Sequence, residues 1–220
     1  MVEPLPFRSN RPLQWMIAWL AGIWLVTAIA PFNRFDWLLE NLLVFIYGAL
    51  LLLTYCRFPF SNTSYSLFTL FLTLHLVGAH YTYAEMPLGF WLRDAFDLGR
   101  NHYDRIVHFA YGLLIAYPFR EVLLRAARVR PAWSYFLAVT AVLGFSGFYE
   151  VLEAGVAMVV SPELGDAYLG TQGDIWDAQR DMGLAFLGAI LAMLATAWRQ
   201  RKNACAAKGF GTMAEGQKNT

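Results

Sequence analysis

The sequence predicts an all-α fold, namely a polytopic membrane helical bundle with about six transmembrane helices. The chain has 220 residues, of which 58% are hydrophobic and only 15% charged, and its mean hydropathy is +0.41. Soluble domains are about 45–50% apolar and about 25% charged. This composition excludes a disordered chain, a nucleic-acid binder and most soluble enzymes. The net charge of +1 gives no global field that would steer a partner.

Apolar stretches of spanning length recur along the chain. A bilayer core of about 30 Å needs about 20 apolar residues in a helix. The six stretches that meet or approach this length are Leu13–Ala30, Trp37–Tyr55, Tyr65–Tyr83, Tyr103–Leu124, Trp133–Val160 and Met182–Trp198. No internal repeat or long linker separates them. Residues 13–198 are therefore predicted to form one six-span domain, with a cytoplasmic tail over 1–12 and a disordered cytoplasmic tail over 199–220.

The first stretch shares features with a secretory signal peptide. Arg8 and Arg11 precede it, and it ends in Ala28-Ile29-Ala30, a small-residue cleavage pattern. Pro31 would occupy the first mature position, and the stretch is longer than a usual signal core. We therefore expect an uncleaved membrane anchor.

The charged residues divide unequally between the two sides of the predicted bundle. Twelve of the seventeen Lys and Arg residues lie on the side of the two termini, which the positive-inside rule places in the cytoplasm. Cys56 and Cys205 then lie on the reducing side, where a disulfide is not expected. Thirteen of the sixteen acidic residues and all four histidines lie on or toward the opposite, outer side. Topology does not explain this concentration, because acidic residues contribute little to orientation.

Several of these polar residues have spacings that place them on shared helix faces. Asp104 and His108 are four residues apart, and Glu150 and Glu153 are three apart. The two glutamates come about 18 and 21 residues into the fifth apolar stretch. Ionisable groups at such depth face the bundle interior and usually mark function. Two glutamates on one face repel each other and require a cation, a proton or a basic partner.

An acidic stripe begins the sixth span, and two histidines end the third. Asp174, Asp177 and Asp181 follow the spacing i, i+3, i+7. His75 and His80 are five apart, so an ideal helix points them in different directions. Only a distorted helix end around Gly78 would turn both toward one site.

Purely structural explanations compete for several of these residues. Asn101 with Asp104, and Asp174 with Asp177, each fit a helix N-cap followed by an acidic residue. Capping does not account for Asp181, which lies two turns into its helix. His75 is also explained as a polar side chain satisfied between helices.

Carboxylates and imidazoles that converge from several helices suit a divalent metal such as zinc, manganese or iron. The candidate metal ligands are His75, His80, Asp104, His108, Glu150, Asp174, Asp177 and Asp181. No His-Glu-x-x-His, Glu-x-x-His or Gly-x-Ser-x-Gly motif occurs. The sequence therefore indicates the chemistry of the site without a reaction-specific motif.

Several stretches resemble an uncharacterised family of bacterial inner-membrane proteins typified by YjdF. These stretches are DWLLENLLVF (36–45), GAHYTY (78–83), NHYDRIVHFAYGLLIAYPFRE (101–121) and, most specifically, AYLGTQGDIWDAQRDM (167–182). The family's motif residues fall here on His75, His80, Glu85, His102, Asp104, Arg105, His108, Tyr149, Glu150, Glu153, Thr171, Gln172, Gly173, Asp174, Asp177 and Asp181. The resemblance implies the six-span fold and the location of a site, and it implies no reaction.

Three functions are compatible with this pattern. The first is a metal-dependent hydrolase at the periplasmic face, acting on a lipid or lipid-linked substrate. The cation would lower the pKa of a bound water. Glu153 would be the general base and Arg105 would steady a phosphate or an oxyanion, with Tyr149 as a third candidate catalytic residue.

The second function is a small transporter or channel with a proton or cation relay. Against it, the cluster lies at one face and the chain has no repeat of the kind transporters often show. The third is a non-enzymatic subunit or scaffold, which would require a donor for every acid.

The segment Met86–Arg100 is either a lid over the site or, since Trp91 and Phe96 suit head-group depth, a short interfacial helix.

Overall fold

The computed structural model describes the backbone of residues 6–216, and within it the side chains except those of residues 163, 166, 167 and 204–216. The described part is helical and contains no strand. In chain order its elements are η1 (Phe7–Ser9), α1 (Arg11–Thr27), α2 (Arg34–Thr54), α3 (Asn62–His80), α4 (Pro87–Phe96), α5 (Tyr103–Arg125), α6 (Pro131–Ala157), α7 (Pro162–Leu169) and α8 (Asp177–Gly216).

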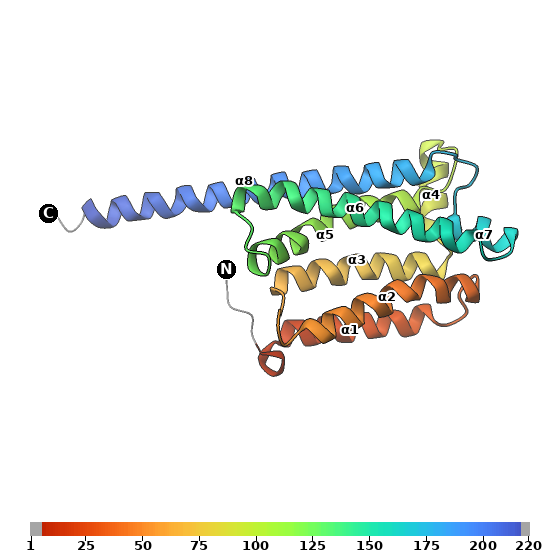
Figure 1. Cartoon of the computed structure of the whole chain (residues 1–220), viewed down its shortest axis with the longest axis horizontal. Helices are drawn as coiled ribbons and strands as arrows, with labels where there is room; N and C mark the ends of the chain where they lie inside the picture. The colour runs from red at the N-terminus through yellow and green to blue at the C-terminus, as the bar shows by residue number, and fades with distance from the viewer. Residues whose placement is uncertain (1–5, 217–220) are drawn as a thin grey trace.

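The long helices form two groups of three that lie side by side (Figure 1). One group contains α1, α2 and α3, and the other contains α5, α6 and α8. Helix α3 packs against α5 and joins the two groups. The short helices α4 and α7 lie at one end of the bundle, whereas η1 and the last turns of α8 lie at the other.

Four helices are long and apolar enough to cross a membrane. They are α2, α5, α6 and the Asp177–Asn203 part of α8. The predicted stretches Leu13–Ala30 and Tyr65–Tyr83 correspond to α1 and α3, which run alongside these four. Helix α1 has only 17 residues, and polar residues occur along α3, which lowers its hydropathy. The helical bundle is thus established, while the count of six spans stays a prediction.

Small residues bring α5 and α8 into close contact. A Cβ atom on Gly112 would lie 1.8 Å from the carbonyl oxygen of Ala185, and one on Gly188 would lie 2.3 Å from that of Phe109. Ala189, fully buried, belongs to the same core. Stripes of small residues allow such close approach in membrane bundles, where dispersion contacts drive helix association. The outer ends of α5 and α8 are therefore held at a short and fixed separation.

Side-chain caps fix the starts of several helices. The Oδ1 atom of Asn33 accepts hydrogen bonds from the backbone of Phe35 and Asp36 at the start of α2. The Oδ1 atom of Asn101 accepts one from the backbone N–H of Tyr103 at the start of α5. These contacts satisfy N–H groups that would otherwise lack partners. The helix starts near Asn101 as predicted, but the N-cap position is His102, whose side chain makes no capping hydrogen bond.

The C-terminal segment bears on the predicted limit of the membrane domain. Helix α8 continues through Gly216, into the segment 199–220 for which the sequence predicts disorder. The Ala, Arg, Lys and Gln residues of that segment favour helix, and residues 217–220 lie outside the described part. The disordered tail stays a prediction.

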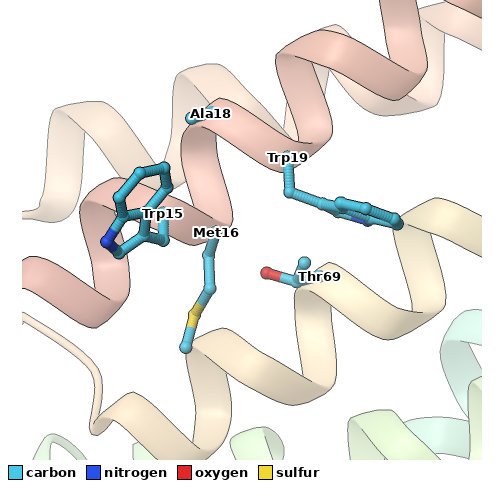
Figure 2. A pocket seen from close by; sticks show the side chains of 5 residues that line it. All are labelled: Trp15, Met16, Ala18, Trp19 and Thr69. Atoms are coloured by element: carbon cyan, nitrogen blue, oxygen red, sulfur yellow. The ribbon is translucent and has the colours of Figure 1, made fainter.

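An open groove lies on the apolar outer surface between α1 and α3 (Figure 2). It is lined by Trp15, Met16, Ala18, Trp19 and Thr69. Thr69 is the single polar side chain among these five. None of the candidate site residues lines this groove, so it is separate from the polar cluster.

Candidate functional site: a carboxylate and histidine cluster

Three of the candidate ligands meet where α5 faces α8. Asp104, His108 and Asp181 each offer one ligand atom, and these atoms all lie within 4.8 Å of one another. Asp104 and His108 come from successive turns of α5, and Asp181 comes from the second turn of α8. The close α5–α8 contact one turn further along both helices brings the side chains together.

Glu150 of α6 joins this group. Its Oε1 atom lies 3.7 Å from the Nε2 atom of His108, which also lies 3.5 Å from the Oδ1 atom of Asp104. Glu150 Oε1 and Asp181 Oδ1 are both buried and have no hydrogen-bond partner. Asp181 is only 2% exposed. Buried carboxylate oxygens rarely lack a partner. This group therefore has ligand atoms for a cation and two oxygens that a cation would provide with a partner. We call Asp104, His108, Glu150 and Asp181 the α5–α8 acidic cluster.

Asp174 and Asp177 belong to an ion-pair network with three arginines. Asp177 is paired with Arg100 and, at 3.3 Å, with Arg105. Asp174 is paired with Arg105 and, at 2.5 Å, with Arg180. Both aspartates thus have arginine partners, unlike the oxygens of the α5–α8 acidic cluster.

Asp174 is not the N-cap of α8, because that helix begins only at Asp177; its side chain closes a turn before the helix. Its Oδ1 atom accepts a hydrogen bond of 3.1 Å from the backbone N–H of Trp176. Desolvation opposes ionisation of Asp174, but this hydrogen bond and the nearby Arg180 and Arg105 outweigh it and lower the pKa of the carboxyl group. Asp174 is therefore a charged partner of arginines that also caps a turn.

The guanidinium group of Arg105 is largely occupied. Its Nη2 atom serves both aspartates, and its Nη1 atom donates to the Nδ1 atom of His102 at 3.1 Å. Because Nη1 is a donor, His102 accepts at Nδ1 in its neutral form. Burial and the positive charges of Arg105 and Arg100 lower the pKa of His102 accordingly. Only the buried Nε atom of Arg105 lacks a partner.

Arg100 holds the connector between α7 and α8 over this end of the bundle. Besides Asp177, it donates to the carbonyl oxygens of Thr171 at 2.7 Å and Gly170 at 3.0 Å. The Gln172 side chain exchanges two hydrogen bonds of 3.0 Å with the backbone of Asn101. The sequence gives no signal for Arg100 as an anchor, because its partners lie about seventy residues away along the chain.

The two histidines of α3 have other partners. The Nε2 atom of His75 lies 3.1 Å from the carbonyl oxygen of Glu40, and its Nδ1 atom lies 2.6 Å from the Tyr83 hydroxyl. A carbonyl oxygen only accepts, so Nε2 carries the hydrogen and Nδ1 accepts from Tyr83. The Nδ1 atom of His80 contacts the carbonyl oxygen of Thr27 at 2.9 Å. Helix α3 stays regular up to His80. It therefore lacks the distorted end that would turn His75 and His80 toward one site.

A second group of polar side chains lies where α2 faces α6. The Tyr149 hydroxyl donates to Glu40 Oε2 at 3.1 Å, and Glu153 lies beside the same hydroxyl. Asp36, one turn before Glu40, is buried with an unpaired Oδ1 atom. Neither Asp36 nor Glu40 is among the metal ligands or catalytic residues predicted from the sequence. Their i, i+4 spacing near the start of a span was the available signal.

Comparison with known proteins gives two matches. A family model described as "Predicted membrane protein (DUF2238)" matches residues 12–202. The inner membrane protein YjdF of Escherichia coli (strain K12) is 38% identical over 176 residues, which cover 80% of this chain and 84% of the relative. No solved structure matches.

Proposed function

Because this chain belongs to the family of predicted membrane proteins called DUF2238, we propose that it is a six-span inner-membrane protein with a divalent cation site at its periplasmic end. We further propose that it uses the cation to hydrolyse a lipid or lipid-linked substrate. The name of the Escherichia coli relative places that protein in the inner membrane. Four apolar helices of spanning length in this chain support the same location.

The proposed topology has six spans and two cytoplasmic termini. Helices α1 and α3 run parallel to the four longer apolar helices, and the described ends of the chain lie at one end of the bundle (Figure 1). An even number of spans places both termini on the same side of the membrane. The excess of Lys and Arg at that end supports its cytoplasmic location.

One observation carries the cation proposal. In the α5–α8 acidic cluster, two buried carboxylate oxygens have no hydrogen-bond partner, and three ligand atoms already lie within 4.8 Å of one another. The nearby arginines are engaged by Asp174 and Asp177. A divalent cation held by Asp104, His108, Glu150 and Asp181 would neutralise the cluster. Mixed carboxylate and imidazole ligands suit zinc, manganese or iron.

The neighbouring side chains suit hydrolysis. A bound cation would supply an acidified water at neutral pH. Glu153 would accept the proton of the attacking water, and Tyr149, held by Glu40, would hydrogen-bond to the reacting group. Arg105 would contact an anionic head group only if that group replaced Asp174 as its ion-pair partner. A substrate attached to lipid fits because the cluster lies at the end of the spans.

Metal analysis of the detergent-purified chain is the first test. After dialysis against zinc, manganese or, anaerobically, ferrous iron, we expect about one tightly held ion per chain. Asp181→Asn and His108→Ala should lose that ion. Asp94→Asn is the matched control, because Asp94 is exposed and pairs only with Arg93. The absence of bound metal in the unaltered chain would overturn the cation site.

The reaction is tested separately. The metal-loaded chain is incubated with phospholipids and lipid-linked sugars, and released head groups are measured. Glu153→Gln should retain the ion and abolish release. Cation binding without release, accompanied by cation flux into proteoliposomes, would favour the transporter alternative. Stable folding without metal, flux or release would favour the scaffold alternative.

A further inference from the structure

Helix α4 differs from the other elements in direction and in surface. It runs across the long axis of the bundle, at the end where α7 also lies (Figure 1). If the long helices cross a membrane, a helix in this direction lies parallel to the membrane plane.

The outward surface of α4 is apolar. Leu88, Trp91 and Ala95 follow the spacing i, i+3, i+7 and are all exposed, with Trp91 at 63%. Phe96 at the helix end is 66% exposed. On the flank of this stripe, Arg93 pairs with Asp94 at 2.8 Å. An apolar stripe flanked by a charged pair is the pattern of a helix that lies in a membrane interface.

The connector before α8 adds apolar side chains at the same end. Ile175 is 86% exposed and Trp176 is 57% exposed, although their neighbours Asp174 and Asp177 are held in the ion-pair network. A fixed backbone thus presents two large apolar side chains outward. Tryptophan is enriched at membrane interfaces because its ring is amphipathic.

The position of α4 is coupled to the start of α5. A Cβ atom on Gly89 would lie 1.6 Å from the Asn101 side chain, so α4 packs directly on Asn101. Asn101 is 1% exposed, and its Nδ2 atom donates to the carbonyl oxygens of Ala84 and Met86 at 2.9 Å each. The depth of α4 therefore fixes the depth of Asp104, three residues after Asn101.

We propose that α4, through Leu88, Trp91, Ala95 and Phe96, is embedded in the periplasmic leaflet at head-group depth, with Ile175 and Trp176 as a second point of insertion. The occupant of this surface is the lipid bilayer itself. The stripe is apolar and exposed, as are many side chains of the long helices, and the charged flank suits the head groups. The α5–α8 acidic cluster then lies level with the head groups of that leaflet.

Spin-label accessibility tests this placement independently of any cation. Cysteine is introduced by Trp91→Cys, Ala95→Cys or Asp94→Cys into a chain that carries Cys56→Ser and Cys205→Ser. Each variant is labelled and reconstituted into vesicles of phosphatidylethanolamine and phosphatidylglycerol. Collision rates with oxygen, which partitions into lipid, and with a water-soluble nickel chelate are compared. Ile46→Cys, which lies near the middle of α2 and is exposed at 67%, marks a site in the apolar region.

The expected result is a higher ratio of oxygen to nickel collisions at positions 91 and 95 than at 94, and a lower ratio than at 46. Equal nickel accessibility at 91 and 94 would overturn the proposal by placing the stripe in water. Low accessibility to both reagents at 91 would also overturn it, because a protein partner would then cover the stripe. Metal content does not enter this readout, so its outcome is separate from that of the cation site.

Discussion

Gly112 of α5 and Ala185 of α8 are in backbone contact, such that a Cβ atom on Gly112 would lie 1.8 Å from the Ala185 carbonyl oxygen. Gly112 comes one turn after His108, and Ala185 one turn after Asp181. The contact therefore sets the spacing of the two helices directly beneath the α5–α8 acidic cluster. Packing in the core and geometry in the site are linked at this point.

Gly112→Ala should push α5 and α8 apart. Overpacking of a close contact costs about 1–3 kcal/mol, and the melting temperature in detergent should fall accordingly. The separation should also weaken cation binding, measured by titration. Gly144→Ala on α6 is the control, because nothing lies within 4 Å of its Cβ. Unchanged stability in both variants would contradict the close packing.

Removal of the cation should destabilise the unaltered chain. A ligand at 100 times its dissociation constant adds about 2.7 kcal/mol to the free energy of unfolding, so a chelator should lower the melting temperature. Asp181→Asn and Glu150→Gln should show no such response, because each removes a ligand and a repelling charge. A chelator effect of equal size in Asp181→Asn would place the metal elsewhere.

Tyr83→Phe should destabilise the fold and leave cation binding intact. The change leaves the buried Nδ1 atom of His75 without its donor, which costs about 1–3 kcal/mol. Tyr135→Phe is the comparison, because its hydroxyl bonds to Gln200 at an exposed position and should matter little. Loss of the metal ion in Tyr83→Phe would instead make His75 part of the cation site.

Arg100→Met should release the connector between α7 and α8. The change leaves Asp177 buried with only Arg105 as a cationic partner, and breaking a buried ion pair from one side costs about 3 kcal/mol. Limited proteolysis should show new cleavage within residues 170–176. The double variant Arg100→Met with Asp177→Asn should recover part of the stability. Equal melting temperatures for Arg100→Met and the unaltered chain would refute the anchoring role.

Part of the site was predictable because helix periodicity is local. The four-residue spacing of Asp104 and His108 placed both on one face, and the position of Asp181 two turns into its helix excluded capping. The same spacing rule warned that His75 and His80 diverge, and they do. The short helix that Trp91 and Phe96 suggest within Met86–Arg100 is present as α4, whereas its place in a membrane interface stays a proposal.

Other features were not predictable because they depend on partners distant in sequence. Asp174 and Asp177 share a stripe with Asp181, but Arg100 and Arg105 engage them through contacts that no local pattern encodes. Glu40 belongs to a polar group only because Tyr149 of α6 donates a hydrogen bond to it.

The sequence by itself determined a helical membrane protein, its family and the end of the bundle where its acids collect, because hydropathy and spacing act within one helix. Only the tertiary structure decided which acids have arginine partners and which stay unpaired. That division depends on the separations between α5, α6 and α8, and the contact of Gly112 with Ala185 fixes the one between α5 and α8.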